Sequence, residues 1–295
     1  EFEDIPIRHH EDLVLRKIYD RVPVKLSSVD FSSPNFKTNV LLQAHFSRIQ
    51  LTADLASDQI LVLERVVKLL SACVDVMSSE GYINALKAMD MTQMVVQAVW
   101  DSDSHLKQIP HFSTAVTQRC IESEVTSVYD VTDLDDEPRD KLLQMDARQM
   151  RDVARFCNAY PSIEIEHEVQ TPDALIASSP IKLAVSLARD EEGEEEDHTV
   201  VAPFYPGKKT ENWWVVVGEA EKSKTLLSIK KVPLQQKANV NLEFQLPKGS
   251  HKLTLSVVCD SYIGCDREFS IDVNVAEGEE SEDESDDEDV EMASS

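Results

Sequence analysis

The feature that most constrains this chain is a change in the spacing of its apolar residues at Ser162. Before Ser162, apolar residues recur at intervals of three and four, which is the period of an α-helix. After it they alternate one by one with polar residues, which is the period of a half-buried β-strand. We therefore predict a multidomain protein that is mainly α in its first part and all-β in its second.

The first part is divided into several helices. Apolar stripes predict helices at 13–22, 36–55, 59–77 and 83–100. Pro23 supplies a stop signal after the first of these helices, and Gly81 after the third. Helices of this length joined by short links predict a small helical bundle over residues 1–108.

Shorter helical segments follow over residues 109–160, and they predict a helix-hairpin-helix-like domain. Asp146 and Gln149 have the spacing of a capping box at the start of the last of these helices. Hairpins of this kind usually hold nucleic-acid phosphate with a glycine turn whose backbone amides are exposed. The chain has no glycine between Gly81 and Gly193, so we predict that the phosphate-holding form of the hairpin is lost.

The alternating segments of the second part predict roughly seven strands, each with one apolar face. The clearest of them are 163–169, 181–187, 240–246, 253–259 and 269–275. So many short strands in about a hundred residues favour two packed antiparallel sheets. We predict an immunoglobulin-like or fibronectin type III-like β-sandwich over residues 161–276.

Two tryptophans stand side by side in the predicted strand Asn212–Gly218. Because successive strand residues face opposite ways, Trp213 is assigned to the core and Trp214 to the other face. The Trp214 ring must also be covered, either within the fold, for example by residues 199–206, or by a partner. In the second case we expect a partner-binding surface that contains Trp214, Phe204 and Tyr205.

The negative charge of the chain is concentrated in two runs. The net charge is −26, and residues 190–197 hold seven acids while residues 277–291 hold eleven. The remainder therefore carries only −8, and no basic stripe for a phosphate backbone is visible in the sequence. Residues 277–295 are predicted to form a disordered acidic tail. Ser281 and Ser285 there have an acid three residues later, which indicates either phosphorylation by an acid-directed kinase or a plain solubilising tail.

The motifs of most enzymes are absent from the sequence. It contains neither a Walker phosphate loop nor a Gly-x-Gly-x-x-Gly turn, so we predict no nucleotide site, no cofactor and no catalytic residue. His9-His10-Glu11 lacks the spacing of a zinc-binding helix, and no metal site is predicted. The five cysteines are odd in number and loosely spaced, which favours reduced thiols. No apolar run approaches the ~20 residues of a membrane span.

Several stretches together resemble the Sec63 homology unit of Ski2-like helicases. They are Ile5–Asp12, Leu41–His45, Ala72–Val76, Leu106–Phe112, Asp152–Asn158 and Trp213–Val217. The resemblance runs from Ile5 to Val275. It implies a helical bundle, a helix-hairpin-helix domain and an immunoglobulin-like domain in that order, which is the order that the hydrophobic periods predict.

The resemblance also implies a biological context. It is to the C-terminal such unit of a nuclear, spliceosomal ATP-dependent RNA helicase that acts in U4/U6 unwinding and pre-mRNA splicing. It implies a non-catalytic module for protein interaction and scaffolding. The implied partners are spliceosomal proteins and the helicase domains of its own parent chain, with RNA contact weak or absent and no membrane contact. The alternative is an RNA-contacting accessory domain, for which a basic groove across the helical part would be evidence.

Overall fold

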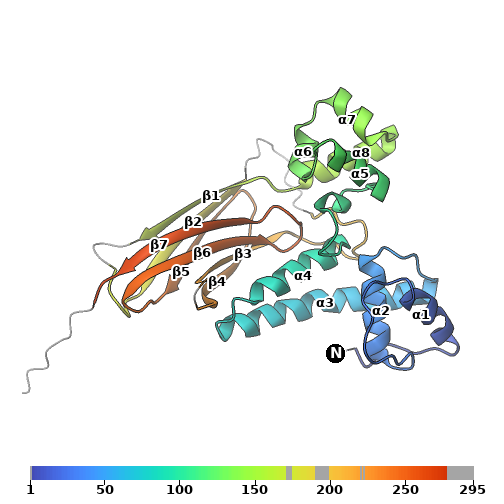
Figure 1. Ribbon diagram of the computed structural model, residues 1–295, viewed down its shortest axis with the longest axis horizontal. Helices are drawn as coiled ribbons and strands as arrows, with labels where there is room; N and C mark the ends of the chain where they lie inside the picture. Colours follow the sequence, from blue (N-terminus) through green and yellow to red (C-terminus); the bar gives the residue numbers. More distant parts are fainter. Residues whose placement is uncertain (1, 171–174, 190–198, 220, 222, 278–295) are drawn as a thin grey trace, which may run out of the picture.

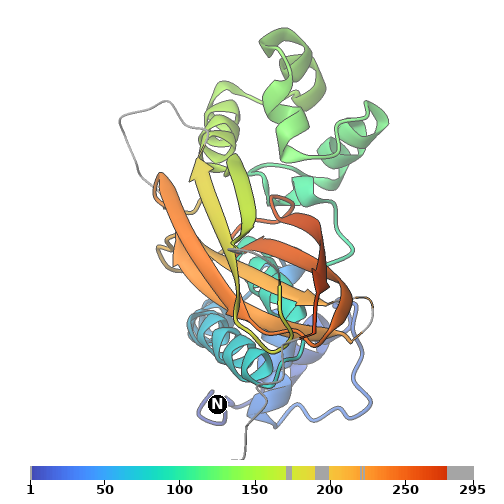
Figure 2. The same ribbon diagram turned by 90° about the vertical axis from the view of Figure 1, so that its left-hand side faces the viewer.

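The computed structural model of the protein describes residues 2–170, 175–189, 199–219, 221 and 223–277, and consists of helices packed on two β-sheets (Figure 1). Two helices run along the sheets, and a cluster of short helices lies at one end of them (Figures 1 and 2). The run 190–197 and the tail from residue 278, with Ser281 and Ser285, lie outside the described residues. The predictions made for those segments remain predictions.

The first helices are α1 (Glu11–Tyr19), α2 (Pro34–Phe46), α3 (Ala53–Ser79), α4 (Ala85–Gln97) and the short 3-10 helix η1 (His105–Gln108). Helix α2 begins where the Ser33 side chain accepts a hydrogen bond from the Phe36 amide, with Pro34 in the first turn. The predicted helix 36–55 is too long, because Arg48 adopts a left-handed conformation (φ 51°) and ends the helical path. Residues 53–55 belong to the next helix instead.

Four short helices follow, namely α5 (Thr114–Glu122), α6 (Val128–Asp133), α7 (Asp136–Leu143) and α8 (Ala147–Ala159). The predicted capping box opens α8, since the Asp146 side chain accepts hydrogen bonds from the amides of Arg148 and Gln149. The Gln149 side chain in turn accepts one from the Asp146 amide at 3.1 Å. Local sequence therefore fixes where this helix starts.

Seven strands occur among the described residues. They are β1 (Ile163–Gln170), β2 (Ile181–Arg189), β3 (Asn212–Glu219), β4 (Thr225–Pro233), β5 (Lys237–Phe244), β6 (Gly249–Cys259) and β7 (Arg267–Val275). They form a three-stranded sheet in the order β1-β2-β5 and a four-stranded sheet in the order β4-β3-β6-β7. All pairings of neighbouring strands are antiparallel, and Trp213 lies between Val232 and Cys259 in the register of the larger sheet.

Two hydrophobic cores use opposite faces of the four-stranded sheet. The larger core lies between the two sheets and continues into α5, α6 and α8 through residues such as Val116, Val128 and Phe156. The second lies on the outer face of the four-stranded sheet, where Val74 of α3 and Met89 of α4 pack. The predicted domain limits at residues 108 and 160 remain predictions, and hydrophobic packing crosses both of them.

Candidate interaction surfaces

Trp213 lies in the core between the sheets, as predicted. Its side chain is fully buried, and its indole Nε1 donates a hydrogen bond to Glu211 Oε1 at 2.5 Å. The same carboxylate accepts an ion-pair bond from Arg189 at 2.6 Å. Burial raises the pKa of Glu211, while Arg189 and Trp213 favour its charged form. The indole, the carboxylate and the guanidinium are thus joined in one buried polar network.

The prediction that the Trp214 ring is open to a partner is wrong. The residue is only 2% exposed and shares a core with Val74 of α3, Met89 of α4 and Leu226 of β4. The Lys231 ammonium group lies 4.3 Å from the centre of the ring. The alternative that the ring is covered within the fold is confirmed, although helices α3 and α4, and not residues 199–206, provide the cover.

The other two predicted site residues differ in exposure. Phe204 is 46% exposed, and the Arg48 guanidinium lies 4.2 Å from its ring centre. Tyr205 is partly buried against a cluster that includes Phe46 and Trp100, and burial raises the pKa of its hydroxyl. Of the three predicted aromatic residues, Phe204 alone therefore presents a substantial ring surface to solvent. Partner binding by Phe204 and Tyr205 remains a prediction.

The motif Ile5–Asp12 is held by a buried ion cluster. The Lys37 side chain is fully buried and donates to Glu11 at 2.7 Å, to Asp58 at 2.6 Å and to the Pro6 carbonyl at 2.6 Å. Arg8 pairs with the same two carboxylates from the rim. Two positive and two negative charges thus connect the N-terminal segment to α2 and α3. His9 and His10 are exposed outside this cluster.

Helix α3 carries apolar residues on two sides. One side contributes Val62, Val66 and Val74 to the buried cores. The other side presents an exposed apolar stripe that we call the α3 stripe. It consists of Leu69, Ala72, Cys73 and Val76, of which Val76 is 64% exposed. Leu61 is also exposed, but Glu64, Arg65 and Lys68 separate it from this stripe. Contiguous exposed apolar surface of this kind marks interaction sites. The spacing of the stripe was readable in the sequence, but only the structure shows which of the two apolar rows is covered.

At two of the turns between the short helices, those before α6 and before α8, the chain's own carboxylates occupy backbone amides. Asp130 accepts hydrogen bonds from the amides of Thr126 and Ser127, both at 2.8 Å. These backbone bonds lower the pKa of Asp130. Asp146 does the same at the start of α8, as described above. The amides that a phosphate would need at these helix starts are therefore already occupied.

The exposed face of α8 carries three arginines, which the sequence analysis missed. Arg148, Arg151 and Arg155 are exposed, and no described residue forms an ion pair with any of them. Their spacing of three and four residues within a helix opened by a capping box was the available signal. The statement that the chain lacks a basic stripe is therefore wrong for this one helix.

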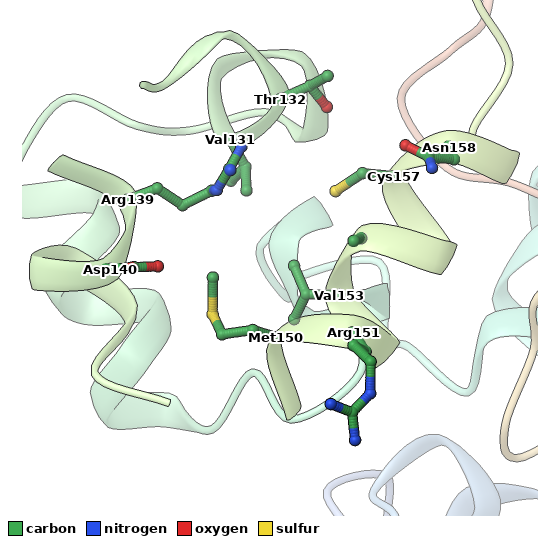
Figure 3. Close-up of a pocket in the computed structure, with 10 residues that line it drawn as sticks. Val131, Thr132, Arg139, Asp140, Met150, Arg151, Val153, Cys157 and Asn158 are labelled. Atoms are coloured by element: carbon green, nitrogen blue, oxygen red, sulfur yellow. The ribbon is translucent and has the colours of Figure 1, made fainter. Parts of the chain in front are cut away.

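A hollow of about 390 Å³ lies between α6, α7 and α8. Met150, Val153 and Cys157 of α8 border its middle, with Arg139 and Asp140 on the α7 side (Figure 3). Burial raises the pKa of the Cys157 thiol. Arg139 pairs with Asp136, so its charge is already partly neutralised.

Among the described residues, no group of three or more histidine, cysteine or acidic side chains is placed to hold a metal ion. None of the helices in that part of the chain is both long and apolar enough to cross a membrane.

The chain is similar to known proteins over nearly its whole length. A family model described as the Sec63 Brl domain matches residues 1–272. The U5 small nuclear ribonucleoprotein 200 kDa helicase is 48% identical over 281 residues in Homo sapiens and 46% identical over 294 residues in Drosophila melanogaster. The pre-mRNA-splicing factor brr2 of Schizosaccharomyces pombe is 46% identical over 280 residues. These alignments cover 94–97% of this chain and 13–14% of the length of each relative.

Proposed function

The chain belongs to the Sec63 Brl domain family, as its motifs predicted, and on that premise we propose that it is a non-catalytic protein-interaction and scaffolding module of a spliceosomal RNA helicase. The names of the relatives support a place in a U5 small nuclear ribonucleoprotein and in pre-mRNA splicing. We propose further that the module is the C-terminal unit of a nuclear, ATP-dependent helicase that acts in U4/U6 unwinding. Its partners would be spliceosomal proteins and the helicase domains of its parent chain.

The strand order supports an immunoglobulin-like or fibronectin type III-like sandwich for the β part. A three-stranded sheet of the first, second and fifth strands faces a four-stranded sheet with the third, sixth and seventh strands in adjacent positions. Immunoglobulin-type sandwiches pair their strands in this way. Such folds serve many functions, so the function must be argued from the surfaces that this one presents.

The single observation that carries the interaction proposal is the α3 stripe. An exposed helix that bore only charged residues on this side would need no partner. Here Leu69 and Val76 are 37% and 64% exposed, with the exposed Ala72 and Cys73 between them at helical spacing. Covering such a row with another protein surface removes apolar area from water, which stabilises a complex by about 25 cal/mol per Å² before the cost of association.

A second candidate function, contact with RNA, is supported by the arginines of α8. Arginine side chains are the usual partners of phosphate groups. The closed turns at Asp130 and Asp146 weigh against it, because the backbone amides there already bond to carboxylates. We therefore favour protein interaction.

Capture from nuclear extract, with and without ribonuclease, tests the two candidates. Tagged chain is compared with Val76→Glu, which breaks the α3 stripe, and with Lys68→Glu, an exposed neighbour on the same helix. We expect spliceosomal proteins to bind the wild type and Lys68→Glu after ribonuclease treatment, and to be lost with Val76→Glu. If ribonuclease abolishes the capture of spliceosomal proteins while Val76→Glu leaves it unchanged, the result would favour RNA contact and contradict the proposal. A melting curve by circular dichroism confirms that each variant is folded.

A further inference from the structure

We propose that the exposed face of α8 binds an acidic peptide segment that carries an apolar side chain. The binding site is the α8 groove, which we define as the two hollows that share Arg151, Ala154 and Asn158. This inference rests on the proposed function and adds the chemistry of one partner and the place where it docks.

The shape of the α8 groove suits an extended chain segment. The hollow between α6, α7 and α8 has a volume of about 390 Å³, and a second hollow of about 800 Å³ lies between α8 and residues 199–203. Ala154 lies where the two hollows meet, and its side chain is only a methyl group. The two hollows thus adjoin along one side of α8, with Arg151 and Asn158 on either side of Ala154 in the sequence of the shared border.

The groove offers both apolar and cationic contacts. The apolar surface that the first hollow offers comes mainly from Met150, Ala154 and Cys157, because Val131 and Val153 also line it but are almost fully buried (Figure 3). Arg151 and Arg155 are exposed beside them. An aliphatic side chain of the partner would fill the apolar part, while its carboxylates would meet the guanidinium groups in paired hydrogen bonds.

The charged side chains that line the groove are positive on balance, with Arg139, Arg151 and Arg155 against Asp140. Asp140 lines the first hollow, and Asp152 of α8 is bonded to His111 at 2.8 Å. Arg151 and Arg155 form no ion pair with any described residue, although Asp152 interacts electrostatically with Arg155. In a chain of net charge −26, a groove whose described lining is positive on balance is a local exception, and it complements an acidic partner.

The lining chemistry favours a peptide over RNA. Proteins that bind single-stranded nucleic acid combine a positive groove with aromatic rings on which bases stack. The lining residues that the structure describes here are aliphatic, cationic, amide or hydroxyl side chains, with one cysteine and one aspartate, and no aromatic ring is among them. The helix starts at Asp130 and Asp146 are closed to phosphate as well.

Fluorescence anisotropy of the full chain with labelled probes tests this proposal. The first probe is a short peptide of Asp and Glu with one central Leu, the second replaces that Leu with Gly, and the third is an oligouridylate of equal charge. We expect the Leu peptide to bind, and the Gly peptide to bind about tenfold more weakly because the apolar part stays empty. The oligouridylate should bind more weakly than either peptide.

Variants locate the binding to the groove. The double variant Arg151→Glu/Arg155→Glu should weaken the Leu peptide about tenfold or more, since two guanidinium contacts become repulsive. Lys17→Glu/Lys68→Glu changes the net charge equally at exposed positions elsewhere, and should leave affinity within about twofold. Ala154→Trp fills the border between the two hollows without changing charge and should abolish the preference for Leu over Gly.

Three results would overturn the inference. They are no binding of the Leu peptide, equal weakening by both charge-reversed double variants, and tighter binding of the oligouridylate that is lost with Arg151→Glu/Arg155→Glu. The test is separate from that of the proposed function, because Val76→Glu lies on α3 and should leave peptide binding unchanged. If the peptide fails to bind while Val76→Glu still releases spliceosomal proteins, the inference fails and the proposed function stands.

Discussion

Trp213 and Trp214 are adjacent in β3, yet their rings lie in two separate hydrophobic cores. Trp213 packs between the two sheets and donates to Glu211, whereas Trp214 packs on the outer face of the larger sheet against Val74 of α3 and Met89 of α4. One dipeptide therefore anchors the sheet to its partner sheet and to the long helices at the same time.

This arrangement predicts that both tryptophans are needed for stability. Removing a buried Trp leaves a cavity and typically costs ~3–5 kcal/mol, so Trp213→Ala and Trp214→Ala should each lower the free energy of unfolding by that amount. Urea unfolding followed by circular dichroism measures it. Phe204→Ala, at an exposed ring, is the control and should change the free energy by less than about 1 kcal/mol. A similarly small change for Trp214→Ala would contradict the structure.

In the buried ion cluster, we expect replacement of Lys37 alone to cost more stability than replacement of Lys37, Glu11 and Asp58 together. Lys37→Met leaves Glu11 and Asp58 buried with only Arg8 as a partner, and should cost ~3–5 kcal/mol in the free energy of unfolding. Replacing Lys37, Glu11 and Asp58 together by apolar residues should recover a part of that loss, because no buried carboxylate remains unpaired. Lys68→Met on the surface of α3 is the control. Equal losses in the single and triple variants would show that packing, and not charge, determines the cost.

The burial of His45 leads us to expect a loss of folding stability in mild acid. Burial lowers the pKa of His45 to about 4, although its Nε2 lies 2.7 Å from the Val95 carbonyl. Between about pH 4 and 6.5 the unfolded chain therefore binds more protons at this residue than the folded chain does, so its contribution to stability rises with pH across that window. His45→Gln should flatten this part of the pH profile of urea unfolding. The exposed His9→Gln should not, and an unchanged slope in His45→Gln would refute the assignment.

The burial of Asp266 leads us to expect the opposite dependence of stability on pH, over an overlapping pH range. Burial raises the pKa of Asp266 to about 6, against hydrogen bonds from Gln93 Nε2 at 2.9 Å and the Cys259 amide at 2.8 Å. Between about pH 3.8 and 6 the folded chain binds more protons here than the unfolded chain, so stability falls as pH rises. Asp266→Asn should remove this contribution. The free energy of unfolding of the variant should then rise more steeply with pH across this window than that of the wild type. An NMR titration of the Asp266 carboxyl carbon with a midpoint at or below about pH 4 would contradict this raised pKa.

Local sequence determined the element types and, at some elements, their limits. The strand β1 could be predicted because Glu164 and Glu166 face solvent while Ile163 is buried, so the alternation of the sequence equals the alternation of burial. The start of α8 could be predicted because a capping box acts within three residues. Both signals arise from contacts between near neighbours in the chain.

The candidate surfaces were predictable only in part. The spacing of Arg148, Arg151 and Arg155 could have been read from the sequence once α8 was placed. The α8 groove could not, because its walls come from α6, from α7 and from residues 199–203, which are joined only by folding. The same holds for the α3 stripe, since both rows of α3 are apolar and only packing shows which one remains exposed.

The sequence by itself therefore determined a helical part, an alternating β part and the inward position of Trp213. The burial of Trp214 was decided by the tertiary structure alone. A strand whose second face meets solvent and one whose second face meets helices can carry the same short run of apolar residues. In this protein the cover comes from α3 and α4, which precede β3 in the chain by many residues. Such a long-range contact leaves no periodic signal at Trp214, so the folded structure was needed to show that this ring belongs to the core.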